Sequence, residues 1–481
     1  MGLALLLCTL GLSALGVDYV PPTHGPNVVL VMTDDMRMDD LQYMPNTLRL
    51  LAAQGATFPQ MLSPYPLCCP ARAEVLSGQY SHNNGVQGNT WPRGGYYKLD
   101  NSNTLPVWLS AHGYETAFMG KYLNEYGSRD PEEVPPGWDV WDGSLHNVYN
   151  YTDVVLNQNG AIVGYPHVYQ TDLFDHTSTD LVRQFAASDT PYFMWVSNIA
   201  PHAECSRAGV PEREISGHCW HPPIPETVDR GTFRGVPPLR NPSINEADMR
   251  DKSAFMQRLP LLTPGQLAGQ RFDRIQRIEA LQSVDRAVAH LVATLKATGE
   301  YRNTYIMFTS DNGIQLGEHR WRYKVLGYEP SVLVPLIIEG PGIPHGVVRQ
   351  QAVTTVDIAA TVTDITNTPP QRLLDGQSVL PLAEGRVPDT GDRIVPLEAG
   401  PIHHTRPTWL YQGVRTNRYT LLLWSNGDIE LYDRRRDPFE LSSVEGEPAY
   451  AAVQRDLLTR LGTMRTCAGR GCIAWVGGRS P

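Results

Sequence analysis

The sequence has no excess of positive charge, no internal repeat and no low-complexity tract. Its 40 lysines and arginines stand against 50 aspartates and glutamates, which gives a formal net charge of −10. Such an acidic balance argues against nucleic acid or an acidic membrane surface as a partner. If the substrate is an anion, a locally positive pocket has to bind it.

The sequence also lacks a hydrophobic segment long enough to be a clear membrane span. Residues 1–17 are apolar and uncharged, but they are too few to cross a bilayer. They resemble the apolar part of a secretory signal, although no basic residue precedes them. We therefore expect an exported protein, periplasmic, extracellular or lysosomal according to its source. A buried amino-terminal helix is the alternative.

Cysteine is scarce, with seven in 481 residues, and the paired C-x-x-C spacing of a structural zinc site is absent. Four cysteines lie close enough in sequence to close small loops as disulfides, which agrees with export. These pairs are Cys205 with Cys219 and Cys467 with Cys472. Histidines near Cys219 leave a zinc site as the alternative for that pair.

Four short apolar runs are typical of strands buried on both faces of a parallel sheet. They span 27–33, 116–120, 192–196 and 304–310. A helix is predicted over 271–297 by apolar residues three and four positions apart, with Gly299 as its stop. Shorter helices are predicted over 46–54 and 105–112, and one further strand over 332–339. Residues 205–262 are predicted to form an irregular segment.

Strands at 420–424 and 430–432 and a helix near 450–465 indicate a second, smaller unit at the carboxyl end. The chain is long enough to bury a large core and to form two domains of unequal size. The predicted fold is α/β, with a large mixed, mostly parallel sheet flanked by helices over 24–392. A smaller α+β domain is predicted over 393–481.

Polar residues follow each of the four apolar runs. Asp34-Asp35, Lys121, His202 and Asp311-Asn312 come after them in turn. In an open α/β sheet the carboxyl ends of the strands share one edge, where ligands bind. Adjacent carboxylates repel each other, and a cation relieves that repulsion. Oxygen ligands favour calcium or magnesium over zinc. The alternative is that Asp34 and Asp35 cap the secondary-structure element that follows them.

Residues 66–84 predict a loop that becomes a short helix. Pro70 suits a first helical turn and Gly78 suits the stop. Cys68 then lies just outside the helix N-terminus, where the dipole favours negative charge. Arg72 lies one turn deeper and can reach the group at position 68. This arrangement is suited to attacking or holding an anion.

Cys68-x-Pro70-x-Arg72, followed by Leu-Ser-Gly, resembles the signature of the sulfatases, which have an alkaline phosphatase-like fold. In that family the motif cysteine is converted to formylglycine (3-oxoalanine) by a formylglycine-generating enzyme. Two cysteines are adjacent here, and Cys68 alone has proline at +2 and arginine at +4. Cys69 is therefore interpreted as a bystander. An ordinary helix start with two buried cysteines is the alternative.

Further segments resemble sulfatase landmarks in the expected order. Residues 120–127 (GKYLNEYG) are most similar to the version in N-acetylglucosamine-6-sulfatases and extracellular heparan sulfatases, which also carry a double cysteine. Many other sulfatases have a histidine where Leu123 stands, so one possible proton donor is missing. Ala-Pro-His at 200–202 and Ser-Asp-Asn-Gly at 310–313 also match, and Lys324 occupies the place of the second active-site lysine.

The resemblance implies a set of roles for these residues. One Ca²⁺ ion, with Mg²⁺ as the less favoured choice, would be held by Asp34, Asp35, Asp311, Asn312 and the modified Cys68. One hydroxyl of the hydrated formylglycine attacks sulfur, and loss of sulfate through the second hydroxyl regenerates the aldehyde. The charge on the sulfuryl group would be offset by Arg72, Lys121 and Lys324. Lys324 or His202 would protonate the leaving oxygen, and His202 could take the second proton.

The implied activity is hydrolysis of sulfate esters, with N-acetylglucosamine 6-sulfate in glycosaminoglycan-type chains as a candidate substrate. Three residues are candidates to line its pocket: His82, Asn124 and His319. Two alternatives stay open. One is a phosphonate monoester or phosphodiester hydrolase of the same superfamily, and the other is a glycan-binding protein without catalysis.

Overall fold

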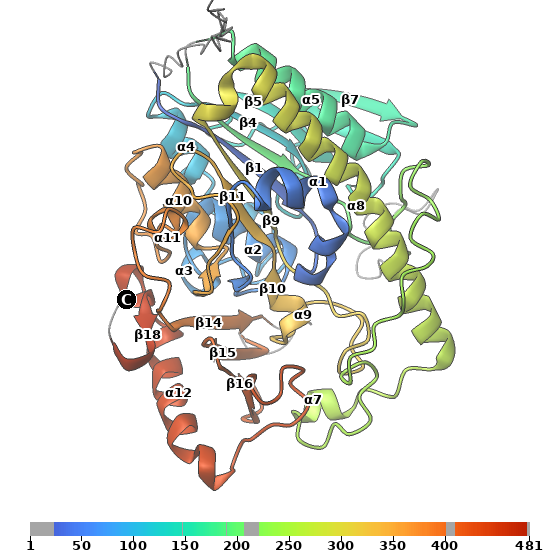
Figure 1. Ribbon diagram of the computed structural model, residues 1–481, viewed down its shortest axis with the longest axis vertical. Helices are drawn as coiled ribbons and strands as arrows, with labels where there is room; N and C mark the ends of the chain where they lie inside the picture. Colours follow the sequence, from blue (N-terminus) through green and yellow to red (C-terminus); the bar gives the residue numbers. More distant parts are fainter. Residues whose placement is uncertain (1–23, 147, 189, 206–220, 401–408, 479–481) are drawn as a thin grey trace, which may run out of the picture.

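A ten-stranded sheet forms the centre of the molecule in the computed structural model, which describes residues 24–146, 148–188, 190–205, 221–400 and 409–478 (Figure 1). The strand order is β12-β2-β11-β9-β1-β8-β4-β5-β6-β7. Five neighbouring strands at its centre run parallel. They are β9 (Thr304–Ser310), β1 (Asn27–Thr33), β8 (Tyr192–Ser197), β4 (Glu115–Gly120) and β5 (Val140–Leu145).

Short antiparallel strands extend the sheet on both sides of this parallel centre. The hairpin of β6 (Asp153–Gln158) and β7 (Ala161–Pro166) continues from β5. On the other side, β11 (Leu336–Glu339) runs antiparallel to β9 and to β2 (Ala56–Thr57), and β12 (Val347–Val348) completes that edge. The sheet is therefore mixed and mostly parallel, as predicted.

Helices cover both faces of the sheet, and β1 shows how the sequence places them. Each residue of β1 is buried, because alternate side chains enter two different cores. Val28 and Leu30 pack on the side of α2 (Cys68–Ser77), α4 (Leu105–Ser110) and α10 (Asp357–Ile365). Val29 and Val31 pack on the side of α5 (Gln170–Phe185) and α8 (Pro264–Thr298).

The long helix α8 begins earlier than predicted. A capping box between Thr263 and Gln266, followed by Pro264 in the first turn, starts it seven residues upstream of position 271. It ends where predicted, at Gly299, whose φ of 86° is in the left-handed region. The predicted helix over 46–54 is instead a short α1 (Pro45–Thr47) continued by a π-helical turn over Leu48–Ala52.

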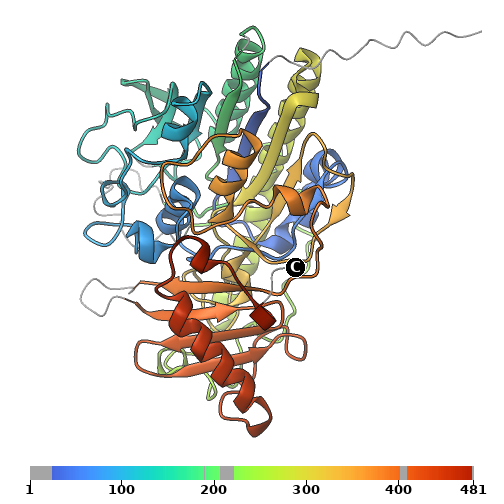
Figure 2. The ribbon, with the colours of Figure 1, turned by 90° about the vertical axis from the view of Figure 1, so that its left-hand side faces the viewer.

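A separate five-stranded antiparallel sheet forms the carboxyl-terminal part, with α12 (Ala451–Met464) packed across it (Figure 2). Its order is β17 (Ile429–Asp433), β16 (Tyr419–Trp424), β15 (Tyr411–Arg415), β14 (Arg393–Ala399), β18 (Ala474–Trp475). This arrangement confirms the predicted fold class. Cys467 and Cys472 form the predicted disulfide. The predicted signal segment, and Cys219 of the other predicted pair, lie outside the described residues.

The predicted strand over 332–339 is divided by Pro335, which lies between β10 (Leu333–Val334) and β11. β10 pairs instead with β3 (Met61–Leu62), next to β13 (Val353–Thr354), in a small third sheet. The remaining short helices are η1 (Met38–Tyr43), α3 (Ser81–Asn84), η3 (Tyr96–Lys98), α7 (Ala254–Gln257), η4 (Glu300–Asn303), α9 (Glu329–Val332), α11 (Leu380–Ala383), η5 (Pro448–Tyr450), η6 (Gly469–Cys472) and η7 (Val476–Gly478). Within the described part of the chain, each helix is too short or too polar to cross a bilayer.

Candidate active site

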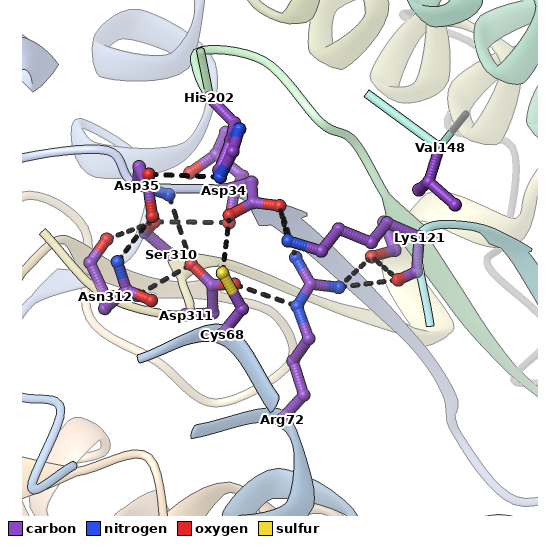
Figure 3. A network of polar contacts seen from close by, with 12 residues as sticks. Asp34, Asp35, Cys68, Arg72, Lys121, Val148, His202, Ser310, Asp311 and Asn312 are labelled. Carbon is purple, nitrogen blue, oxygen red and sulfur yellow. Dashed lines mark hydrogen bonds and ion pairs between the residues drawn. The ribbon is translucent and has the colours of Figure 1, made fainter. Parts of the chain in front are cut away.

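The carboxyl ends of β1, β4, β8 and β9 bring their polar residues to one place at the edge of the sheet (Figure 3). Asp34 and Asp35 follow β1, Lys121 follows β4, and Asp311 follows β9. These side chains, with His202 beyond β8, surround Cys68 at the first turn of α2. The predicted convergence on one edge is therefore seen in the structure.

Cys68 is the first residue of α2, one position further into the helix than the sequence predicts, and it is 1% exposed. Its Sγ atom lies 2.7 Å from Lys324 Nζ and 3.5 Å from Asp34 Oδ1. Burial and the neighbouring Asp34 carboxylate raise the pKa of the thiol to about 12. The unmodified thiol is therefore protonated at neutral pH.

Cys69, by contrast, belongs to the hydrophobic core. Its backbone N–H donates to Asn89 Oδ1 at 3.1 Å, and its side chain is fully buried. The two adjacent cysteines thus point into different environments, one polar and one apolar. Cys68, the residue predicted to be converted, is the one that contacts Lys324 and Asp34.

Potential metal ligands gather around Cys68, and one of their oxygen atoms lacks a hydrogen-bond partner in the part of the chain that the structure describes. Ligand atoms of Asp34, Asp35, Cys68 and His202 lie within 4.8 Å of one another. Asn312 Nδ2 donates to Asp35 Oδ1 at 2.6 Å, while the buried Oδ1 atom of Asn312 has no hydrogen-bond partner among the described residues. A buried acceptor without a partner is costly. Carboxylate oxygens with an amide oxygen are the donor set of a hard divalent cation, so these residues fit calcium.

The backbone at Asp35 is itself unusual. Its φ of 67° lies in the left-handed region, which costs a non-glycine residue of order 1 kcal/mol. Its N–H donates to Asp311 Oδ1 at 3.1 Å, and Arg277 on α8 donates to its carbonyl oxygen. This strained backbone conformation accompanies the placement of both adjacent carboxylates, Asp34 and Asp35, in the same site.

Three cations offset these carboxylates. Arg72 Nε donates to Asp311 Oδ2 at 2.8 Å, and Nη1 donates to the Lys121 carbonyl and to Ser197 Oγ, both at 2.6 Å. Lys121 forms an ion pair with Asp34, and Lys324 forms one with Asp35. Burial would raise the pKa of Asp34, but Lys121 and the other nearby cations prevail and lower it to about 2. The carboxylate is therefore ionised at neutral pH.

His202 is buried beside these groups. Its Nδ1 lies 2.8 Å from the Ala203 carbonyl, which can only accept, so Nδ1 carries the proton. Its Nε2 lies 3.5 Å from Asp35 Oδ2. Burial, with the lysines on the same side, lowers the pKa of His202 to about 4. The imidazole is neutral at pH 7, and Nε2 can accept a proton.

Tyr149 is a further residue that the structure places at the site. Its ring stacks on His202 with centroids 4.3 Å apart, and Lys121 Nζ lies 4.6 Å from its centroid. Asn124 Nδ2 donates to its hydroxyl at 3.1 Å. The predicted pocket residue Asn124 thus reaches the site through Tyr149.

Ser197 and Arg277 were missed entirely, because a serine at a strand end and an arginine in a long helix carry no signal of their own. Tyr323, 41% exposed beside Lys324, was also missed. Nothing in their local sequence distinguishes them from ordinary surface or helix residues. Their relation to the site depends on contacts between distant segments.

The structure does not bring the other two predicted pocket residues to the site. His82 has both ring nitrogens bonded elsewhere, to Glu398 at 2.9 Å and to the Cys467 carbonyl at 3.1 Å. His319 bonds Glu246 at 2.6 Å and packs on Tyr328. Both histidines therefore serve contacts within the scaffold. Leu123, which stands where many sulfatases have a histidine, is part of the hydrophobic core.

Comparison with protein-family models decides the family. The sulfatase model matches residues 26–368, and a model described as N-sulphoglucosamine sulphohydrolase, C-terminal, matches residues 317–467.

The chain belongs to the sulfatase family.

This sulfatase is a sulfuric ester hydrolase, and several named relatives agree. It is 34% identical over 403 residues to human N-acetylglucosamine-6-sulfatase, covering 79% of this chain and 68% of the relative. It is 28% identical over 527 residues to an arylsulfatase of Volvox carteri, covering 98% and 79%. It is 31% identical over 379 residues to a putative extracellular Sulf-1 homolog of Caenorhabditis elegans, covering 76% of this chain but 50% of that relative.

Solved structures show the same fold. A protein in complex with its substrate D-glucosamine-2-N,6-O-disulfate has a TM-score of 0.74 at 22% identity, covering 91% of this sulfatase and 97% of that chain. A phosphonate monoester hydrolase of Agrobacterium radiobacter has a TM-score of 0.67 at 23% identity, covering 92% and 96%. At these identities the likeness concerns the fold alone.

Proposed function

We propose that this sulfatase removes sulfate from glycosaminoglycan-type sugars and that N-acetylglucosamine 6-sulfate is the unit it recognises. The observation that carries the proposal is the arrangement at Cys68: Lys324 and Asp34 contact this buried residue, and Arg72 pairs with Asp34 and with Asp311 beside it. The sugar is inferred from the 34% identity to human N-acetylglucosamine-6-sulfatase.

Two groups complete the proposed site. A calcium ion would be held by Asp34, Asp35, Asp311, Asn312 and the oxygen at position 68, where the Cys68 Sγ atom stands in for that oxygen. The ion would supply Lewis-acid polarisation of its ligands. Conversion of Cys68 to formylglycine by a maturation enzyme would supply an aldehyde, and addition of water to that aldehyde would give the hydroxyl that attacks sulfur and the second hydroxyl through which sulfate is released.

The side chains of this chain would carry out the remaining steps. Arg72, Lys121 and Lys324 offset the negative charge that develops on the sulfuryl oxygens. Lys324 Nζ, which contacts Cys68 Sγ, lies next to the reacting atoms and donates a proton to the departing sugar oxygen. His202 Nε2, neutral at pH 7, accepts the proton that must leave the residue at position 68.

The first experiment is intact-mass analysis of the peptide that contains Cys68. Conversion to formylglycine replaces SH₂ by oxygen and lowers the mass by about 18 daltons. Protein with confirmed conversion is then assayed on N-acetylglucosamine 6-sulfate, on aryl sulfate and on aryl phosphonate. A higher rate on phosphonate than on sulfate would favour the phosphonate monoester alternative, and no hydrolysis of any ester would favour glycan binding without catalysis.

We also propose that the protein is exported. The apolar segment 1–17 supports this proposal, as does the Cys467–Cys472 disulfide, a bond typical of proteins in oxidising compartments. Expression of the full chain followed by sequencing of the mature amino terminus tests it. Retention of residues 1–17 on the mature protein would contradict a cleaved signal.

A further inference from the structure

A compact loop, residues 87–95, projects a tryptophan into solvent next to the active site. Trp91 is 52% exposed, whereas Trp108, Trp141 and Trp195 are buried. Burial of a tryptophan side chain against a binding partner releases a large free energy, so an exposed tryptophan is suited to binding one. We call residues 87–95 the Trp91 loop.

Backbone hydrogen bonds within the Trp91 loop hold its two arms together. Gln87 N–H donates to the Arg93 carbonyl at 2.6 Å, and Gly94 N–H donates to the Thr90 carbonyl at 2.8 Å. Where the two arms cross, a Cβ atom on Gly94 would lie 1.6 Å from the Gly88 carbonyl oxygen. The crossing therefore requires glycine, and it holds Trp91 at the tip of the loop.

Two anchors tie this loop to residues that neighbour the site in sequence. Asn89 Oδ1 accepts from the N–H of Cys69, the neighbour of Cys68. Trp91 N–H donates at 2.9 Å to Glu125, four residues after Lys121. Because Trp91 is two residues from Asn89, its Cα lies within roughly 7 Å of the Cα of an anchor that touches the nucleophile helix.

A cation completes the surface that the loop presents. The exposed guanidinium of Arg129 lies 5.4 Å from the Trp91 ring centroid and 4.0 Å from that of Tyr97. The Tyr97 side chain is held in place, because its hydroxyl accepts a hydrogen bond from the backbone N–H of Arg129 at 2.9 Å. The group combines aromatic faces with a positive charge on a protein whose net charge is −10. Apolar ring faces bind the carbon face of a sugar, and a guanidinium binds carboxylate or sulfate.

We propose that Trp91, Tyr97 and Arg129 form a second saccharide subsite, which binds the sugar next to the one that carries the scissile sulfate and recognises an anionic group on it. This inference rests on the proposed function, since it assumes a glycan substrate. It implies that the enzyme acts better on chains than on single sugars. Lys121 and Arg129 lie on the same segment, so the reacting sugar and its neighbour are held by one stretch of chain.

The test compares matched substrates on formylglycine-containing enzyme. The substrates are aryl sulfate, N-acetylglucosamine 6-sulfate, and two tetrasaccharides that end in that same sulfated sugar. In one tetrasaccharide the neighbouring sugar is a uronic acid, and in the other it is neutral N-acetylglucosamine. Wild-type kcat/KM should be at least tenfold higher on the uronate tetrasaccharide than on the single sugar.

Variants then separate the two parts of the subsite. Trp91→Ala should lower kcat/KM about tenfold on both tetrasaccharides and leave aryl sulfate and the single sugar within about twofold of wild type. Arg129→Gln should lower it on the uronate tetrasaccharide alone. Phe272→Ala, which removes a ring that is 56% exposed on α8, serves as the control and should change nothing.

Equal losses on all four substrates, or no loss on the tetrasaccharides, would overturn the subsite while leaving the proposed function intact. Failure of the wild type to hydrolyse any sulfate ester would instead contradict the proposed function. In that case calorimetric binding of the uronate tetrasaccharide decides the subsite. It should bind wild type at least tenfold more tightly than Trp91→Ala or Arg129→Gln, and equal affinities would overturn the proposal. Circular dichroism and melting temperatures establish that each variant is folded.

Discussion

Two regions of this sulfatase that contain buried charges can be compared: the edge of the large sheet around Cys68, and the seam where the carboxyl-terminal sheet meets the rest of the chain. At the seam, Arg393 forms a two-point ion pair with Asp357, and Arg415 forms one with Glu329 at 2.7 and 3.0 Å. Asp357 also accepts from the N–H of Thr354. Both guanidinium groups thus meet a carboxylate at two points, although Arg393 Nε and Arg415 Nη1 have no hydrogen-bond partner among the described residues.

Around Cys68 the lysines and carboxylates that the structure describes do not form two-point ion pairs of this kind. Lys121 and Lys324 lie against carboxylates, the Asn312 Oδ1 atom has no partner in the described part of the chain, and Asp35 has a left-handed backbone. Polar groups arranged in this way are suited to a cation and an anionic substrate that arrive from outside. The comparison teaches that burial of charge alone does not mark a functional site. The mark of the site is the convergence of carboxylates, lysines and an arginine from several strand ends on one point.

Removal of the nucleophile should have the largest effect. Cys68→Ala is expected to lower kcat/KM on aryl sulfate by at least about 10⁴-fold, because the residue to be converted is lost. Cys69→Ala provides the matched control, since its side chain packs in the core. It should lower the melting temperature and leave the activity of the folded protein close to wild type. A comparable loss of activity in both variants would contradict the assignment of Cys68.

Removal of the proposed acid should have the next largest effect. Lys324→Met is expected to lower kcat by about 10²–10³-fold on an alkyl sulfate, whose leaving group needs a proton. On an activated aryl sulfate, whose leaving group departs without one, the loss should be about tenfold. Steady-state rates on the two esters measure the difference. Equal losses would mean that Lys324 acts through its charge and not as an acid.

The unpaired oxygen of Asn312 gives a test of the metal site. Asn312→Leu is expected to weaken calcium binding by about 10- to 100-fold, since it removes one oxygen ligand. The calcium concentration that restores activity after treatment with a chelator measures this, and so does the calcium-dependent rise in melting temperature. A variant that responds to calcium as the wild type does would show that Asn312 is not a ligand.

The seam should respond in stability and not in chemistry. Arg393→Met leaves the Asp357 carboxylate buried without its cation, and we expect the free energy of unfolding to fall by about 3–5 kcal/mol. Denaturant unfolding measures that change. The kcat of the remaining folded protein should stay near the wild-type value, and a selective fall in kcat would show that the seam takes part in catalysis.

The smallest effect concerns pH at the seam. Burial and the nearby Glu329 raise the pKa of Glu440 from 4.5 to about 7. Because the folded state holds this proton more tightly than the unfolded state, the contribution to stability is fully present below pH 4.5. It is lost as the pH rises through about 7. The melting temperature of wild type should therefore fall by a few degrees across that range relative to Glu440→Gln, and parallel curves would contradict the prediction.

The sequence alone was sufficient to predict the centre of the fold. The run 27–33 is apolar at nearly every position because both faces of β1 are covered, and this property is visible without coordinates. The ends of α2 and α8 were equally legible, since Gly78 and Gly299 adopt backbone conformations that favour glycine. The clustering of the polar residues that follow these strands was predictable from one rule: the carboxyl ends of parallel strands lie at the same edge of the sheet.

Long-range contacts decided the rest. His82 and His319 look like pocket residues in the sequence, and only the folded chain shows that their ring nitrogens are bonded to Glu398 and Glu246. Tyr149 reaches His202 across segments more than fifty residues apart, a contact that no local pattern encodes. Local sequence was therefore sufficient to predict which residues gather at the strand ends around Cys68, because motif spacing and strand ends are properties of neighbours along the chain. The tertiary structure decided what surrounds them, because packing joins residues that have no relation in sequence.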